Sequence, residues 1–210
     1  MNKEELRVYF ICGTPNCPKG MFFKTLEAAL KSGVTCFQLR EKGDGALIGK
    51  EKLDLALKVK ELCHKYHVPF IINDDVDLAL QVDADGIHIG QDDLPVTEAR
   101  KLFSNKIIGL SVGNVREYQL SEIDLVDYIG VGPIFPTPSK SDAGEVIGLK
   151  GLRGIRELDK VIPIVAIGGI TVGDVPAICE SGADGVAVIS ALAKSTQIEL
   201  DTQRFAEAFH

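Results

Sequence analysis

Clusters of charged and amide side chains follow three successive apolar, strand-like runs of the sequence. The clusters are Gln38-Leu39-Arg40-Glu41-Lys42, Asn73-Asp74-Asp75 and Gln91-Asp92-Asp93. In proteins, Mg²⁺ is commonly bound by one or two carboxylates, and phosphate oxygens and water complete its coordination. Basic side chains beside them could bind the same phosphates. The clusters therefore predict a site that holds a metal ion and a polyphosphate.

A second candidate site for an anion lies later in the chain, at two segments that carry glycines and hydroxyl groups. The run 164–167 is followed by Gly168-Gly169-Ile170-Thr171, and Ser190-Ala191 follows the run 185–189. Glycine lets the backbone approach a phosphate, and amides at a helix N-terminus point at its oxygens. Thr171 alone could equally be a helix N-cap. Its pairing with Ser190 favours a phosphate-binding site.

Eight short apolar, β-rich runs are predicted to be the strands that position these residues. The runs are 8–12, 36–39, 70–72, 86–89, 107–110, 128–131, 164–167 and 185–189. Between several of them, apolar residues recur at helical spacing, which predicts a helix with one buried face. These faces are Phe23, Leu26, Ala29 and Leu30; Leu55, Val59, Leu62, Cys63 and Tyr66; and Val172, Val175, Ile178 and Cys179. Ser32-Gly33 and Ser181-Gly182 are predicted to end two of the helices.

The alternation of strands and helices predicts one α/β domain over residues 1–210, a closed (β/α)8 barrel. Parallel strands are buried on both faces and therefore read as continuous apolar runs, and right-handed crossovers place the helices outside. Residues 84–89 also resemble residues 183–188, half a barrel away. A doubly wound open sheet is the structural alternative. In a barrel, ligands bind at the carboxyl ends of the strands, so the clusters would meet at one mouth.

Composition excludes several other classes of protein. With 210 residues, 45% of them hydrophobic, the chain can form one substantial core. A net charge of −7 argues against nucleic acid and anionic membrane as partners, and no apolar stretch reaches membrane-spanning length. The five cysteines are odd in number and irregularly spaced, as expected of a reduced, cytoplasmic protein. The oligomeric state stays open.

Several polar residues also have a purely structural interpretation. Asp75 or Asp92 could cap the following helix, and a single Asp here is as good a cap as a ligand. Glu41 could be a structural or solvent-facing partner of the neighbouring cations. His88 lies within a predicted strand and is expected to be a satisfied core histidine. Two further histidines are expected to be solvated at a helix end, His64 and His67.

The order of these segments resembles the thiamine-phosphate synthase family over about residues 34–190. The matching segments are Gln38-Leu39-Arg40-Glu41-Lys42; Asn73-Asp74-Asp75; residues 85–91 with Asp93; Gly109-Leu110-Ser111; residues 132–137 with Lys140; and Ile167-Gly168-Gly169-Ile170. The resemblance implies a transferase that joins hydroxymethylpyrimidine diphosphate to a thiazole phosphate or its carboxylated form. Thiamine phosphate and pyrophosphate would be the products of a dissociative substitution that needs no protein nucleophile.

The resemblance also implies a role for each residue of the site. The residues implied to bind the pyrimidine diphosphate are Gln38, Arg40, Lys42, Asn73, Ser111 and Lys140, and the segment 38–42 adds Leu39 and Glu41 to the predicted substrate-binding residues. Those implied to bind the thiazole phosphate are Thr137, Pro138, Ser139, Gly168, Ile189 and Ser190. Asp74 and Asp93 would bind Mg²⁺. The catalytic residues would be Arg40, Lys42, Ser111 and Lys140.

Two departures from the family pattern and two rival functions accompany this prediction. After Ser111 the chain has Val112-Gly113-Asn114 where the family commonly has a histidine, and Ser139 stands in place of a frequent threonine. The proline-rich segment 132–142 could be a mobile lid or an ordered clamp. One rival is a thiazole tautomerase of the same fold, which needs no diphosphate-metal site. The other is a non-catalytic barrel that binds phosphorylated metabolites.

Overall fold

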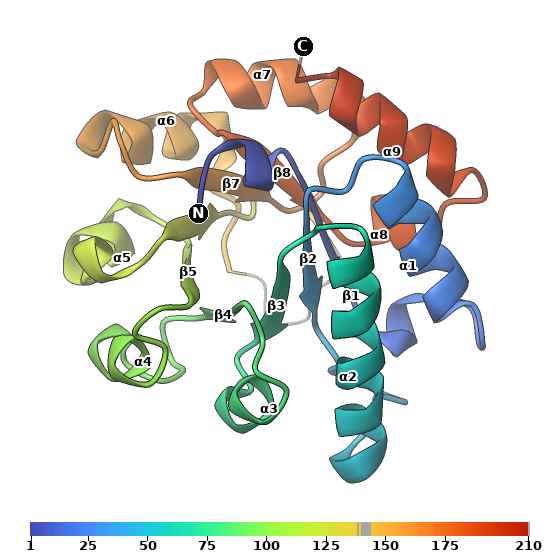
Figure 1. The fold of residues 1–210 in the computed structure, drawn as a ribbon. Helices are drawn as coiled ribbons and strands as arrows, with labels where there is room; N and C mark the ends of the chain where they lie inside the picture. Colours follow the sequence, from blue (N-terminus) through green and yellow to red (C-terminus); the bar gives the residue numbers. More distant parts are fainter. Residues whose placement is uncertain (138, 140–143, 210) are drawn as a thin grey trace.

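Parallel strands close into a barrel with a central axis that Figure 1 views nearly end on. The computed structural model of the protein describes residues 1–137, 139 and 144–209. Within these ranges, eight strands pair in the order of the sequence, and the last pairs with the first. They are β1 Val8–Cys12, β2 Cys36–Leu39, β3 Phe70–Asn73, β4 Gly86–Ile89, β5 Ile107–Val112, β6 Tyr128–Val131, β7 Ile164–Ile167 and β8 Gly185–Val188. The predicted (β/α)8 barrel is confirmed, and the open sheet is excluded.

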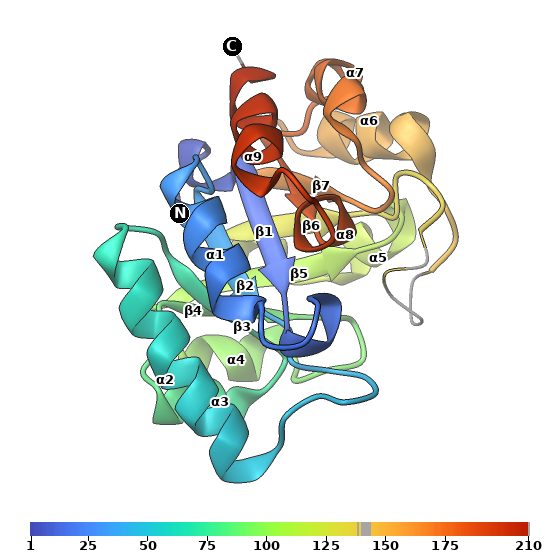
Figure 2. The same cartoon turned by 90° about the vertical axis from the view of Figure 1, so that its right-hand side faces the viewer.

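Helices surround the barrel on its outside, as Figures 1 and 2 show. They are α1 Phe22–Lys31, α2 Gly49–Lys65, α3 Val76–Gln81, α4 Val96–Leu102, α5 Val115–Leu120, α6 Gly148–Leu158, α7 Val175–Glu180, α8 Ser190–Ala193 and α9 Ile198–Glu207. Short 3₁₀ helices are η1 Glu4–Leu6, η2 Thr14–Asn16, η3 Ile123–Leu125 and η4 Val172–Asp174. The last helix, α9, packs beside α1 and completes the outer layer. Among the described residues, no helix has the length and apolarity to cross a membrane.

The predicted element positions hold with two informative differences. Strand β5 continues beyond Leu110 to Val112, so Ser111 lies on a strand rather than in a loop. In α1 the buried aromatic residue is Phe22, whereas the predicted Phe23 is 39% exposed. Phe22 stands four residues before the buried Leu26, at the spacing that keeps two side chains on one face of a helix. The outer core lies between the strands and these helix faces.

The interior of the barrel is closed at its N-terminal end by the first 3₁₀ helix. Leu6 is fully buried and belongs to the inner cluster of apolar side chains. A Cβ atom on Gly185 would lie 1.7 Å from the carbonyl oxygen of Leu6. Glycine at the start of β8 therefore lets η1 seal this end of the barrel, which leaves the opposite end for a binding site.

The same hydrogen-bond pattern occurs at four places around the barrel, and each time it joins the N-terminal ends of two consecutive strands. The residue before each even-numbered strand accepts a hydrogen bond through its side chain from a backbone N–H near the start of the preceding strand, at 2.8 to 3.0 Å. Its own backbone N–H donates to the carbonyl of that same residue. The accepting residues are Thr35, Asp85, Asp127 and Asp184. Asp85 and Asp184 are the equivalent aspartates of the repeat predicted between residues 84–89 and 183–188.

Two of these four hydrogen-bonded junctions, here called clamps, also contain an arginine, which comes from the helix before the strand whose N–H the aspartate accepts. Arg156 of α6 donates to Asp184 at 2.7 Å, and Arg100 of α4 donates to Asp127 at the same distance. Each guanidinium also donates to three backbone carbonyls: Asp159, Ile162 and Gly182 for Arg156; Phe103, Lys106 and Leu125 for Arg100. The fixed fork of the guanidinium suits it to this many acceptors.

We expect Arg156→Met to lower the free energy of unfolding by about 3 kcal/mol, since it leaves three carbonyls without their donor and removes the guanidinium from a partly buried carboxylate that, among the described residues, keeps only Lys3 and the Ile164 N–H. The side chains of Arg156 and Asp184 are only 13% and 15% exposed. Denaturant titration followed by circular dichroism measures the change. Arg204→Met is the control, because the Arg204 pair with Asp201 is exposed and its loss should change stability by less than about 0.5 kcal/mol. Equal losses in both variants would contradict a special role for the clamp.

Candidate active site

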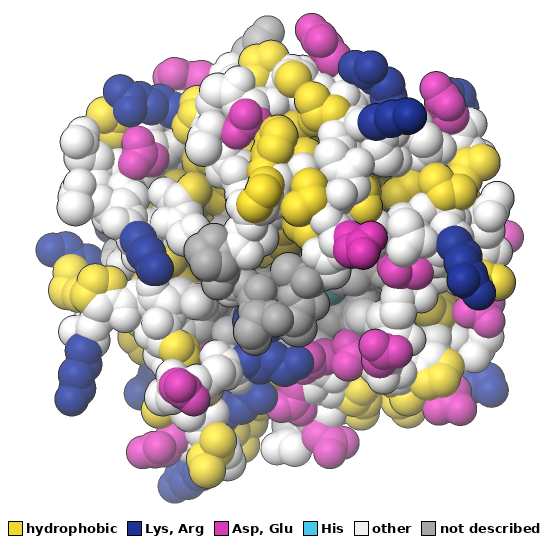
Figure 3. All heavy atoms as spheres, turned by 180° about the vertical axis from the view of Figure 1, so that it is seen from behind, with side chains coloured by type: hydrophobic (Ala, Val, Ile, Leu, Met, Phe, Trp, Pro, Cys, Tyr) yellow, Lys and Arg dark blue, Asp and Glu magenta, His cyan; other side chains and the backbone are white. Residues whose placement is uncertain are grey.

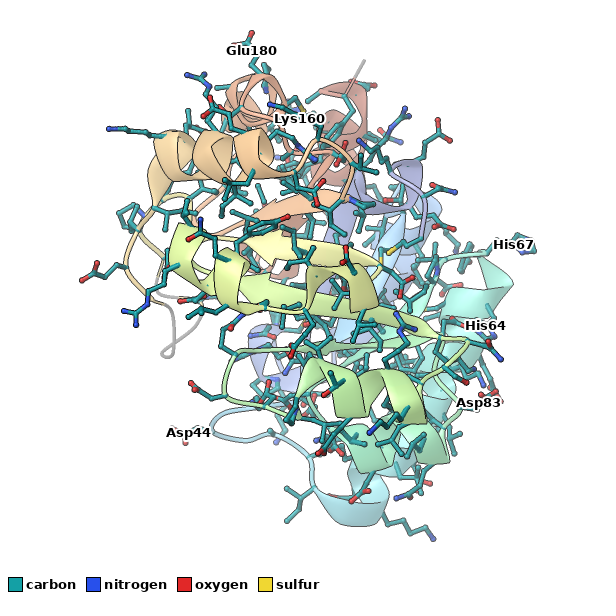
Figure 4. The ribbon with its side chains drawn as sticks, turned by 90° about the vertical axis from the view of Figure 1, so that its left-hand side faces the viewer. Asp44, His64, His67, Asp83, Lys160 and Glu180 are labelled. Carbon is teal, nitrogen blue, oxygen red and sulfur yellow. The ribbon has the colours of Figure 1, made fainter. Side chains whose placement is uncertain are left out.

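A cavity of about 710 Å³ opens at the C-terminal ends of the strands. Asp44, in the loop after β2, lies at this end of the molecule in Figure 4, whereas His64, His67 and Asp83 lie at the opposite end. The two histidines are thus remote from the cavity. On the face of the molecule seen in Figure 3, basic and acidic side chains lie close together near the centre, and apolar side chains gather above them.

The cavity brings together most of the predicted site residues. Those that line it are Arg40, Lys42, Asn73, Asp74, Asp93, Ser111, Thr137, Ser139, Gly168, Ile189 and Ser190. Two others, Pro138 and Lys140, lie outside the described residues. Residues from the ends of seven different strands or their following loops therefore share one cavity, as closure of the barrel requires.

Three predicted binding residues do not line this cavity. Leu39 is buried in the outer core at 2% exposure. Glu41 is 5% exposed, and its carboxylate accepts hydrogen bonds from the backbone N–H groups of Thr14 and Leu47 at 2.7 and 2.8 Å and from the Thr14 hydroxyl. Glu41 therefore joins the loops after β1 and β2, and its structural interpretation fits better than a binding role. Gln38 is 1% exposed and points into the barrel interior, where it lines a separate small cavity.

Lys42 and Asp74 form an ion pair at the edge of the cavity. Asp74 has a φ of 50°, in the left-handed region that residues other than glycine rarely adopt. Its backbone N–H donates to the carbonyl of His88 at 2.8 Å, which holds this conformation in place. His67 and Asp83 have the same conformation at the opposite end of the molecule, so a positive φ alone does not indicate function. The position of Asp74 in the cavity lining, beside Lys42, is what makes it a candidate ligand.

Of two neighbouring carboxylates, Asp75 has a structural role and Asp92 lines the cavity. Asp75 caps α3 by accepting from Leu78 N at 3.0 Å, and it pairs with Lys52 at 2.6 Å, so its predicted alternative as a helix cap is correct. Asp92 lines the cavity and is not the cap of α4, which begins after Pro95.

Asp93 lines the cavity while it also closes its own loop. Its Oδ2 accepts from Gly90 N at 2.7 Å, which leaves the other carboxylate oxygen for a ligand. No group of three or more Asp, Glu, His or Cys side chains among the described residues could hold a metal ion unaided. Asp74 and Asp93 fit the donor set of Mg²⁺, which commonly takes one or two carboxylates and completes its octahedron with substrate phosphate and water.

Ser111 reaches the cavity from β5 and is joined to His88 of β4, with Oγ 2.9 Å from Nε2. His88 is 8% exposed and hydrogen-bonded, as predicted for a core histidine, yet it also lines the cavity. Period-two alternation along β4 could have revealed this position, because side chains alternate between the two faces of a strand.

Two further polar side chains line the cavity: Gln91, which belongs to one of the predicted clusters, and Glu117, which sequence reasoning missed. Gln91 Nε2 donates to the Ser111 carbonyl at 2.8 Å. Glu117 accepts from the backbone N–H of Gly113 at 2.6 Å, and Asn114 caps α5 by accepting from the Glu117 N–H at 2.9 Å. The segment that departs from the family pattern after Ser111 is therefore an ordered helix-capping turn. The Asn114 to Glu117 spacing is the signal that could have identified it.

The opposite side of the cavity is built from loops that follow β6, β7 and β8. Gly168 has a φ of 106°, and a Cβ atom there would lie 2.6 Å from the Cβ of Pro133. Phe135 N donates to the Gly168 carbonyl at 3.0 Å, so the loop after β6 rests directly on the end of β7. Ser139 Oγ donates to Ser190 Oγ at 3.1 Å, which joins that loop to α8. Hydroxyl groups and close backbone approach thus coincide here.

Thr171 is a helix N-cap, which was the structural alternative to a phosphate contact. Its hydroxyl and its backbone N–H both donate to Asp174 Oδ2, at 2.6 and 2.8 Å, in a capping box at η4. The hydroxyl of Thr171 is therefore engaged in the cap, and Ser190 is the better candidate for a phosphate contact on this side.

Comparison with known proteins identifies the family. The family model described as thiamine monophosphate synthase matches residues 8–192. A protein from Streptococcus suis named thiamine-phosphate synthase is 58% identical over 207 residues, which span 96% of this chain and 90% of that protein. Thiamine-phosphate synthase 1 of Streptococcus pneumoniae serotype 4 is 52% identical over 206 residues, 98% of this chain and 99% of the relative.

A solved structure agrees with both. Thiamine phosphate pyrophosphorylase from Pyrococcus furiosus superposes with a TM-score of 0.87 at 35% sequence identity, and the match covers 99% of this chain and 96% of that one. The match between the family model and nearly the whole barrel, together with relatives above 50% identity, leads to one conclusion. This chain belongs to the thiamine monophosphate synthase family.

Proposed function

We propose that this protein is a thiamine-phosphate synthase that joins hydroxymethylpyrimidine diphosphate to a thiazole phosphate, plain or carboxylated. The supporting observation is a single cavity with two unlike sides. Arg40, Lys42, Asp74 and Asp93 line one side, and the glycine and hydroxyl groups of the loops after β6, β7 and β8 line the other. The deciding experiment mixes the purified protein with both substrates and Mg²⁺ and measures thiamine phosphate and pyrophosphate.

Binding of two anions on opposite sides of one mouth would bring their other ends together over the barrel axis. This positioning replaces a bimolecular encounter by a reaction within one complex, and it removes much of the entropic barrier. The thiazole phosphate would be held by Ser190 and by backbone groups around Gly168. The diphosphate would be held by Arg40 and Lys42.

Charge stabilisation would then be the main task of the protein. Breaking the carbon–oxygen bond to the diphosphate leaves negative charge on the leaving group and an aminopyrimidine methylene cation, which the thiazole nitrogen captures. Arg40 and Lys42 would neutralise the growing negative charge, with Lys140 beyond the described residues as a further candidate. Asp74 and Asp93 would hold Mg²⁺, which supplies positive charge to the diphosphate oxygens.

The two rival functions make different predictions in the same assay. A thiazole tautomerase would isomerise its substrate without needing the pyrimidine diphosphate, and it gives no reason for the strained Asp74 beside Lys42. A metabolite-binding barrel would bind both ligands without turnover. We also expect small molecules as partners and a cytoplasmic location, since the chain is acidic and its five cysteines are free thiols.

We expect Arg40→Ala to slow product formation by about 10² to 10³, the usual effect of removing one preorganised group that stabilises developing charge. Lys140→Ala should act similarly. The control is Lys160→Ala, which removes an exposed cation outside the cavity and should leave the rate unchanged. Steady-state turnover of Arg40→Ala within a factor of about two of the parent would remove Arg40 from the catalytic residues.

Asp93→Asn and Asp74→Asn should each raise the Mg²⁺ concentration needed for half-maximal activity, because each removes one negative charge from the ligand set. Their effects should be non-additive if both bind the same ion. Asp75→Asn is the matched control: Asn can still cap α3, so the Mg²⁺ requirement should stay that of the parent. Activity across a Mg²⁺ series distinguishes the roles, and an unchanged requirement in Asp93→Asn would return that residue to closing its loop.

Ser190→Ala should weaken binding of the thiazole phosphate by about tenfold, the equivalent of one hydrogen bond to a charged group, and leave the pyrimidine diphosphate nearly unaffected. Lys42→Ala should give the reverse pattern, because it lies on the other side of the cavity. Calorimetric titration of each variant with each ligand measures both. Parallel losses for the two ligands in either variant would mean that the assignment of the two sides is wrong.

A further inference from the structure

Five polar side chains form a continuous chain of hydrogen bonds from the barrel interior to the cavity. Gln38 Nε2 donates to Tyr9 Oη at 2.9 Å, and Tyr9 Oη lies 2.7 Å from Tyr128 Oη. Tyr128 Oη lies 2.9 Å from His88 Nδ1, whose Nε2 lies 2.9 Å from Ser111 Oγ. The first three side chains are at most 1% exposed, so the chain is shielded from bulk water until it reaches His88 and Ser111.

The barrel is shaped around this chain. A Cβ atom on Gly109 would lie 2.1 Å from Tyr128 Cζ and 2.5 Å from His88 Nδ1. One on Gly130 would lie 3.1 Å from His88 Cε1. The rings of His88 and Tyr128 have centroids 5.5 Å apart, and those of Tyr9 and Tyr128 are 5.8 Å apart. Two strand glycines therefore make room for a packed stack of polar rings at the centre of the molecule.

Both tyrosines keep their protons. Burial and the neighbouring Tyr128 raise the pKa of Tyr9 well above its usual value, and burial does the same to the pKa of Tyr128. Each hydroxyl thus has one proton to donate. Cys36 also lies beside Tyr9, but sulfur is a weak acceptor, and its own thiol faces the Pro69 carbonyl.

The donor at Gln38 sets the direction of the remaining bonds. Tyr9 accepts from Gln38, so its proton goes to the close oxygen of Tyr128. Tyr128 then donates to His88 Nδ1. A neutral imidazole that accepts at Nδ1 carries its proton on Nε2, and it donates that proton to Ser111. The Ser111 proton is left to point into the cavity.

We propose that Tyr9, Tyr128 and His88 are positioning residues that orient the Ser111 hydroxyl as a hydrogen-bond donor toward the leaving diphosphate. The assignment of the acceptor rests on the proposed function, whereas the direction of the chain does not. A donor aimed at developing negative charge stabilises the transition state more than the ground state. If the hydrogen bonds ran in the opposite direction, Ser111 would donate its proton to His88. It could then not donate that proton to the substrate.

The other end of the chain has a matching feature. Gln38 Oε1 is buried, and no donor among the described residues reaches it. Gln38 lines a small cavity of about 10 Å³ that shares His88 and Ser111 with the large one. A buried carbonyl without a donor costs free energy that a ligand N–H would recover. A donor at Oε1 would keep Nε2 turned to Tyr9, and it would thereby help to fix the orientation of Ser111.

Nitrogen-15 NMR of the histidine-labelled parent protein tests the direction without any substrate, with His88→Gln used to assign the signal. We expect a neutral His88 ring with its proton on Nε2. A proton on Nδ1, or on both nitrogens, would overturn the proposed direction. This result stands whether or not the protein makes thiamine phosphate, so it separates the failure of this inference from the failure of the proposed function.

Kinetics of Tyr128→Phe test the positioning role in an active parent. The variant should lose on the order of tenfold in kcat, the rate equivalent of one hydrogen bond, with little change in KM. In a Ser111→Ala background the same substitution should cost less than about twofold, because the group that it orients is gone. Tyr118→Phe, which loses a hydroxyl bonded to Asp159 outside the barrel, is the matched control and should keep the parent rate.

Two outcomes would overturn the positioning role. One is a kcat of Tyr128→Phe equal to that of the parent. The other is the same tenfold loss in both backgrounds, which would mean that the tyrosine acts independently of Ser111. Tyr9→Phe provides a second variant with the same expected pattern if Tyr128→Phe does not fold. A melting curve that matches the parent identifies which variants can be compared.

Discussion

Pairing of β8 with β1 is the constraint on which the rest of the structure depends. Closure gives every strand two neighbours and brings all the strand ends that carry polar residues to a single mouth. Four repeated clamps then fix the other end of the strands, where side chains of Thr35, Asp85, Asp127 and Asp184 accept backbone N–H groups. The two ends of the barrel therefore do different work: one end holds the strands in register, and the other is free to carry strained and charged residues around a ligand.

A closed barrel also has an interior that must be filled, and here the filling is partly polar. Buried polar groups must find partners inside the protein. Tyr9, Tyr128 and His88 do so by bonding to one another, in space that glycines at 109 and 130 leave open. The same side chains thus satisfy a packing requirement and reach the base of the cavity. In this barrel the core and the active site are continuous, and a substitution at the centre of the molecule affects both.

The fold and most of the candidate site were predictable because both depend on local patterns. Continuous apolar runs locate parallel strands, and polar residues at strand ends locate the mouth. The role of Glu41 could not be predicted from local sequence, because its partners Thr14 and Leu47 belong to loops that only the folded chain brings together. The alternation of strand side chains could have placed Gln38 inside and Leu39 outside. No sequence pattern indicates the left-handed backbone of Asp74, since Asp tolerates that conformation without requiring it.

The conformation of Asp74 has a consequence for how this protein would change under selection. A residue with a Cβ atom at positive φ costs about 1 kcal/mol relative to glycine, so glycine at this position would relax the backbone. A laboratory search for heat resistance alone should therefore favour Asp74→Gly, and the survivors should have lost the carboxylate that pairs with Lys42 at the cavity. The aspartate at this position therefore combines a less favourable backbone conformation with a carboxylate at the edge of the cavity, the kind of compromise between stability and function that proteins often contain.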